Sequence, residues 1–260
     1  MLRSRCSSKN ISASFGCLRC RAGYHIRWLK NGWSDFRAAP GLSLTWGLFA
    51  WILSTVITWA SWKIGGWILL ISVISGYIFV APLLAFALYS VSRQICLGKQ
   101  PTLGKTLRAV KKPIGNFLVF AIVLIVIFLL WARAGTMVHI FFPSDGSVKL
   151  QDLALYLGVG SAVGSIFASI TFAASVFSLP FIANRDVDVI TAVVSSINAV
   201  LRNRRTVLVW ALLVIAFTAL GFLTAMIGFI IIIPLLGFAT WHGYRDALNV
   251  QGWPTLPVIE

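Results

Sequence analysis

Eight polar residues at the ends of apolar stretches are the residues in this sequence best suited to binding chemistry. They form a candidate polar cluster of acids, arginines and one histidine: Asp35, Arg37, Arg185, Asp186, Asp188, His242, Arg245 and Asp246. Each acid lies within a few residues of an arginine, so the group could surround a lipid head group or a small anion. The alternative, which we favour, is that these charges cap helix ends and neutralise one another.

Catalytic and metal-binding motifs are missing from the sequence. It contains neither a G-x-S-x-G nor an H-E-x-x-H pattern, and three histidines are too few for haem–copper chemistry. Four residues near the start could supply zinc ligands, namely Cys6, Cys17, Cys20 and His25. A single Cys-x2-Cys without a second pair does not predict a zinc site. We therefore expect a protein that is not an enzyme, with no catalytic residue, cofactor or metal.

The composition places these residues in a membrane protein. Hydrophobic residues make up 58% of the 260 positions and charged residues only 11%, whereas soluble domains carry roughly 25% charged residues. Six apolar runs are long enough to cross the bilayer: about 42–62, 65–90, 115–137, 153–181, 206–223 and 226–245. Because the backbone must satisfy its own hydrogen bonds in lipid, the runs predict an all-α polytopic membrane protein.

The basic residues predict the orientation of the chain. Of the 22 Lys and Arg residues, nineteen lie before residue 38, in 93–112, in 183–205, or at Arg245. The positive-inside rule then places both termini on the cytoplasmic side of a bacterial inner membrane. The net charge of +15 is thus a topology signal, and anionic lipid head groups are the expected partner rather than nucleic acid.

An internal repeat predicts the arrangement of the spans. Pro82, Pro180 and Pro234 align when the sequence is shifted on itself. We expect three hairpins, each preceded by an amphipathic interfacial helix, within a membrane domain at 26–248. In the first of these helices, the aromatic residues Trp28 and Trp33 should lie at head-group depth. A disordered basic extension should precede the domain at 1–25, and a tail should follow it at 249–260.

The fourth apolar run carries small residues at every fourth position. Gly160, Gly164 and Ala168 leave one face almost bare, which allows another helix to approach closely in lipid. We interpret this run as a central packing helix, with a wall lining a substrate path as the alternative.

Three segments resemble a known family: NGWSDFRAAPG (31–41), NRDVDVITAVVSSINAVLRN (184–203) and PLLGFATWHGYRDAL (234–248). The family is an uncharacterised bacterial group of predicted integral membrane proteins, catalogued as a domain of unknown function. Some members are labelled cytochrome c oxidase subunit I-like. The resemblance extends over about 26–248 and implies a helical inner-membrane protein without an established activity. Phe238 stands where the family carries a His, and the histidine count disagrees with the oxidase label.

The sequence leaves two functional hypotheses. The first is a non-enzymatic scaffold or accessory protein that engages lipid, a membrane-protein partner or a second copy of itself. The alternative is a transporter for a small solute or lipid-like molecule, with a path between the repeats. Convergence of Thr171, Ser175 and Thr218 on a hydrated site would favour transport.

Overall fold

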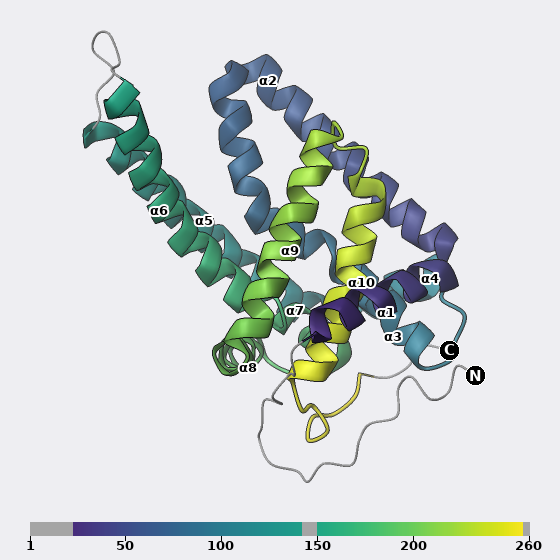
Figure 1. Cartoon of the computed structure of the whole chain (residues 1–260). Helices are drawn as coiled ribbons and strands as arrows, with labels where there is room; N and C mark the ends of the chain where they lie inside the picture. Colours follow the sequence, from purple (N-terminus) through teal and green to yellow (C-terminus); the bar gives the residue numbers. More distant parts are fainter. Residues whose placement is uncertain (1–22, 142–149, 257–260) are drawn as a thin grey trace.

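The structure, a computed structural model, describes residues 23–141 and 150–256. The helices of this part are α1 (Tyr24–Ala38), α2 (Pro40–Leu84), α3 (Phe86–Cys96), α4 (Leu103–Lys111), α5 (Ile114–Phe141), α6 (Leu150–Ser175), α7 (Ser178–Asn184), α8 (Val189–Arg202), α9 (Arg204–Leu223) and α10 (Phe229–Ala247) (Figure 1). The all-α fold class is confirmed in these residues. The predicted extension lies outside them up to residue 22, as does the tail beyond residue 256.

Four stretches of the described chain are long and apolar enough to cross a membrane. They are Pro40–Ile64, Ile114–Gly135, Gly158–Asn184 and Arg204–Leu223, which correspond to the predicted first, third, fourth and fifth runs. The predicted sixth run is helical within α10, but the last turns of α10 carry His242, Arg245 and Asp246 and are therefore less apolar.

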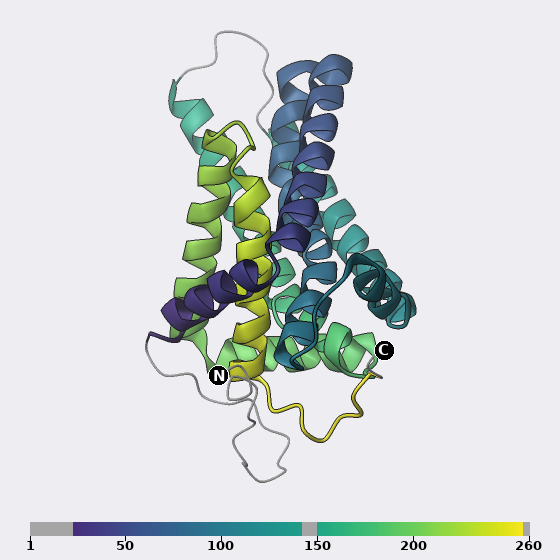
Figure 2. The same cartoon turned by 90° about the vertical axis from the view of Figure 1, so that its right-hand side faces the viewer.

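Residues 63–66, at the junction of the first two predicted runs, are helical, because α2 extends from Pro40 to Leu84. A straight helix of 45 residues would be roughly 68 Å long, about twice the thickness of the hydrocarbon core. Figures 1 and 2 show instead that α2 reverses direction at its far end, and in Figure 1 its two limbs spread apart from that reversal. Gly65 and Gly66 do not end the helix, since an interior glycine costs only about 1 kcal/mol.

The aligned prolines affect their helices differently. The predicted fourth span, 153–181, is divided between α6 and α7. The break lies at residues 176–177, and Pro180, the third residue of α7, has no N–H to donate to the carbonyl of Val176. The predicted second span, 65–90, is likewise divided, because α2 ends two residues after Pro82. Pro234, by contrast, lies inside the continuous α10.

Helix α1 packs into the protein core as well as lying at one end of the bundle. Trp28 is fully buried, and its ring meets those of Trp210 and Phe177 edge-on at centroid distances of 5.6 and 6.5 Å. A Cβ on Gly32 would lie 2.8 Å from the main-chain nitrogen of Ala239, so this glycine allows α1 to approach α10. The expected aromatic face of α1 is therefore divided: Trp28 is buried in protein and Trp33 remains exposed.

Glycine also permits the crossing of α2 and α10. A Cβ on Gly47 would overlap the carbonyl group of Ile230, with the carbonyl carbon only 2.7 Å away. By contrast, other parts of the chain approach the predicted small-residue face of α6 much less closely. A Cβ on Gly160 would meet nothing within 4 Å, and one on Gly164 would lie 3.8 Å from Trp131 Nε1. The role of Gly160, Gly164 and Ala168 in packing stays a prediction.

The two ends of the molecule differ in their connections. Helices α1, α3, α4, α7 and α8 lie at the end from which the C-terminal tail leaves, whereas the reversal of α2 and the turn between α9 and α10 lie at the opposite end (Figure 2). We call the first the basic end, because it includes the described parts of the Lys- and Arg-rich links 93–112 and 183–205.

Candidate functional site

A buried carboxylate at the basic end joins three helices. Asp35 of α1 is buried, and its Oδ2 accepts a hydrogen bond from Ser92 Oγ of α3 at 2.8 Å. The same oxygen lies 2.9 Å from Nε2 of His242 on α10. An acid in this position is stabilised by its polar partners, because an unpaired buried carboxylate would be strongly unfavourable. Asp35 therefore connects α1, α3 and α10.

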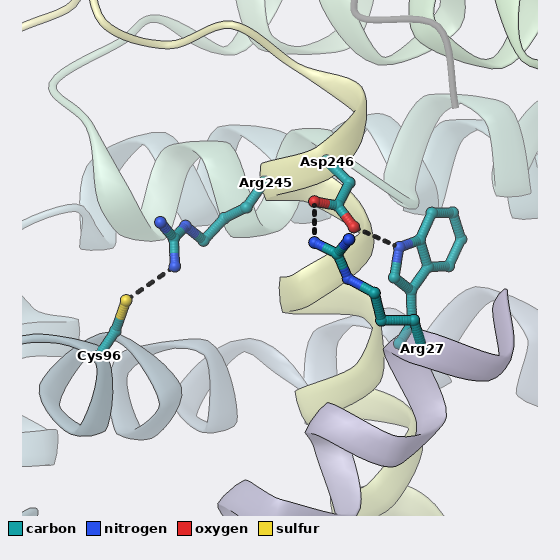
Figure 3. Close-up of polar contacts among 5 residues, drawn as sticks. Arg27, Cys96, Arg245 and Asp246 are labelled. Atoms are coloured by element: carbon teal, nitrogen blue, oxygen red, sulfur yellow. Dashed lines mark hydrogen bonds and ion pairs between the residues drawn. The ribbon is translucent and has the colours of Figure 1, made fainter. Parts of the chain in front are cut away.

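Asp246 makes a second connection between α1 and α10. Its Oδ1 forms an ion pair with Arg27 at 3.2 Å, and its Oδ2 accepts a hydrogen bond from Trp28 Nε1 at 3.0 Å. Figure 3 shows the Arg27 guanidinium against this carboxylate, with Arg245 extending from α10 toward Cys96 instead. The buried indole of Trp28 thus has a partner for its only polar atom.

Closeness in sequence does not decide which side chains of the candidate polar cluster make hydrogen bonds to one another. Arg37 does not bond to Asp35; it lies over the ring of Trp33, 5.3 Å from the centroid. The physical reason is that residues two positions apart on a helix point in nearly opposite directions. Neighbouring Arg245 and Asp246 likewise diverge to different partners.

The two acids after α7 have structural roles. Asp188 is exposed and caps α8, its Oδ2 accepting the Thr191 N–H at 2.8 Å. That hydrogen bond to its charged form lowers the pKa of Asp188. Asp186 is also exposed, and its main-chain N–H donates to the carbonyl of Pro254 at 3.0 Å. These side chains do not join the buried Asp35 contacts.

A second group contains Arg185, Arg245 and a residue that the sequence analysis missed, Arg93. Arg185 Nη1 donates to the carbonyl of Trp253 at 2.7 Å, and Arg93 Nη2 donates to the carbonyl of Leu256. Arg245 Nη1 donates to Cys96 Sγ at 2.8 Å (Figure 3). We call these residues the arginine group. The sequence pattern does not single out Arg93, because no acid lies near it in the chain.

The arrangement contains groups that are suited to binding an anion. The contacts of Asp35 and Asp246 described above hold the helices together. Within residues 23–141 and 150–256, no three His, Cys, Asp or Glu side chains gather in a way that could hold a metal ion. Guanidinium groups are suited to oxyanions, which accept two parallel hydrogen bonds from one arginine.

The residues named for the transporter hypothesis lie on two helices. Thr171 and Ser175 are buried on one face of α6, whereas Thr218 is only partly buried on α9.

Comparison with known proteins identifies one family. A model of the family described as predicted integral membrane protein (DUF2189) matches residues 69–184. The predicted resemblance is confirmed over this stretch, which runs from the second part of α2 to the end of α7. Searches of curated proteins and of solved structures found no significant match.

Proposed function

We propose that this protein is a non-enzymatic scaffold that spans a bacterial inner membrane six times and engages anionic lipid head groups through its basic end. The observation that carries the proposal is the surface of α4 and α8, where exposed apolar side chains accompany exposed cations at one end of the bundle. A membrane interface satisfies both kinds of side chain at once.

Helix α8 is apolar on two opposite sides. Its inner face is buried, and its outer face exposes Ile190, Val194, Ile197 and Leu201 at helical spacing. An apolar stripe of this length on a helix surface favours contact with lipid or protein over contact with water. Arg202, Arg204 and Arg205 follow at the end of the stripe and are exposed, which favours anionic lipid as the occupant.

Helix α4 repeats this arrangement on a smaller scale. Thr102 caps its first turn by accepting the N–H of Lys105. Leu103 and Leu107 are both 46% exposed, and Arg108 and Lys111 are exposed beside them. Leucines toward the acyl boundary with cations toward phosphates are typical of a helix lying in the membrane interface.

Six spans are supported by the helices and by their apolar surfaces. The spans would be the two limbs of α2, then α5, α6 with α7, α9 and α10. Along α5, Leu118, Ile122 and Leu129 are each more than half exposed, which is the pattern of a lipid-facing helix. An even number of spans returns the chain to the basic end, and the positive-inside rule makes that end cytoplasmic.

We expect a cysteine at Ile64 to react with a membrane-impermeant maleimide in intact cells, and a cysteine at Asp186 to react only after permeabilisation. Both positions are exposed. Ile64 lies near the middle of α2 and Asp186 follows α7, and the reversal of α2 and α7 lie at opposite ends of the molecule (Figure 1). The unchanged chain is the blank, because all four native cysteines precede residue 97 in segments predicted to be cytoplasmic. Labelling of the Asp186 variant in intact cells would contradict the orientation.

We expect Arg108→Gln with Lys111→Gln to weaken retention of phosphatidylglycerol about thirtyfold, because each cation near an anionic surface contributes about 1 kcal/mol. Native mass spectrometry of gently solubilised protein measures the retained lipid and also any partner subunit or second copy. The matched control is Lys63→Gln with Arg133→Gln, which removes two exposed cations far from the basic end. Equal losses in the two double variants would exclude a lipid site at the basic end.

A further inference from the structure

We infer that Arg93 and Arg185, with Arg245 beside them, form a binding site for a phosphate group, and that residues 253–256 of the tail occupy this site in the present structure. This inference rests on the proposed function in one respect, namely that the basic end lies at the depth of the lipid head groups. Its evidence is the arginine group and the tail, not the exposed cations of α4 and α8.

Three like charges are brought together from distant parts of the chain. Arg93 belongs to α3, Arg185 ends α7 and Arg245 belongs to α10. Arg185 repels both other arginines. Burial, and then repulsion from Arg185, lower the pKa of Arg93, while Tyr244 opposes the change. Such a cluster is unfavourable in isolation, and an added negative charge would relieve the repulsion.

The hydrogen-bond partners of Arg93 and Arg185 in the described residues are neutral. They are the carbonyl oxygens of Leu256 and Trp253, and for Arg185 also the hydroxyl of Tyr244. Arg185 Nε is buried and has no hydrogen-bond partner among the residues that the structure describes. Charge-assisted hydrogen bonds to an oxyanion are about twice as strong as neutral ones. A phosphate would therefore be a better acceptor for these guanidinium groups than the tail is.

The nearby acids are already engaged. Asp35 and Asp246 attract Arg245 through space. Asp35 nevertheless contacts Ser92 and His242, and Asp246 contacts Arg27 and Trp28.

The tail is attached to the site by a small number of contacts. Thr255 forms an isolated antiparallel bridge with Arg185. Pro254 accepts the Asp186 N–H at 3.0 Å, and the Leu256 N–H donates to Asn184 at 3.4 Å. The Trp253 ring meets that of Phe181 edge-on at a centroid distance of 5.9 Å. An extended segment held in this way, after an exposed turn at Gly252, can be displaced without disturbing the helices.

The proposed ligand is a phosphate oxyanion, which could come from inorganic phosphate or from a lipid head group. The first arm of the experiment adds potassium phosphate to the full-length protein in detergent, with potassium chloride at equal ionic strength as the control. The second arm places the protein in vesicles of phosphatidylcholine alone or of phosphatidylcholine with phosphatidic acid. Hydrogen exchange at the Leu256 and Asp186 amides measures displacement of the tail in both arms.

We expect phosphate from at least one source to accelerate exchange at both amides about tenfold, as the tail gives up its carbonyl contacts. Arg93→Gln and Arg185→Gln should each raise the phosphate concentration needed by about tenfold or more, because each loses a charged hydrogen bond. Trp253→Ala should lower that concentration, since it loosens the competing tail. A general loss of folding would instead raise the phosphate concentration needed, so this variant separates the two explanations.

Acceleration in both arms or in one supports the site and names the source of the phosphate. No acceleration in either arm, or equal responses of the unchanged protein and Arg93→Gln, would overturn the inference. The variant Arg108→Gln with Lys111→Gln separates it from the proposed function. If that variant retains less lipid while Arg93→Gln and Arg185→Gln leave the phosphate response unchanged, the lipid-engaging scaffold stands and the arginine site fails.

Discussion

Replacing Gly47 with alanine is expected to lower the free energy of unfolding by about 3 kcal/mol. The new Cβ would overlap the Ile230 carbonyl at the crossing of α2 and α10. Main-chain atoms of two packed helices cannot rotate away as a side chain can, so the helices must separate. Reversible unfolding in mixed micelles with increasing sodium dodecyl sulfate measures the loss.

The matched control for this prediction is Gly160→Ala on α6. A Cβ there would meet nothing within 4 Å, so the change should alter stability by no more than about 1 kcal/mol, the scale of helix propensity. Similar losses in the two variants would show that helix propensity, and not the close approach of α2 to α10, governs the effect at Gly47.

Replacing Asp35 with alanine is expected to lower the free energy of unfolding by about 3 to 5 kcal/mol, because two polar partners lose their acceptor and each costs about 1 to 3 kcal/mol. His242 Nε2 and Ser92 Oγ would both lose the oxygen to which they are bonded. The same unfolding titration measures this loss, and hydrogen exchange should increase at the contacts of α1 with α10.

Two further variants test the reason for that loss. Asp35→Asn keeps one carbonyl acceptor in nearly the same volume, so its loss should be smaller than that of Asp35→Ala. Asp186→Ala removes an exposed acid and should change stability by about 0.5 kcal/mol or less. An Asp35→Ala protein as stable as Asp186→Ala would show that the buried carboxylate does not hold the three helices together.

The sequence was sufficient to predict the helical membrane character and the collection of polar groups at helix ends. Lipid offers no hydrogen bonds to the backbone, so long apolar runs such as 115–137 must be helical whatever their neighbours. The presence of helix caps was also predictable, because Asp188 accepts a hydrogen bond from an amide only three residues away. These properties depend on residues close together in the chain.

The partners of the charged groups were decided only by the tertiary structure. Asp35 bonds to residues 57 and 207 positions away, and Arg93 meets a tail carbonyl 163 positions away. Which side chains meet depends on how each helix is rotated and where it crosses its neighbours. The spacing of apolar residues along one helix shows which of its faces is apolar. It does not show which residue of another helix packs against that face.

The positions at which glycine allows helices to approach closely were likewise decided by the tertiary structure. Gly160 and Gly164 stand out in the sequence because they are regularly spaced, yet Gly32 and Gly47 make the closer approaches to other helices. Regular spacing shows only that a helix can be approached closely. The approach itself requires a second helix at that height, and the fold places α10 against α1 and α2 rather than against the small face of α6.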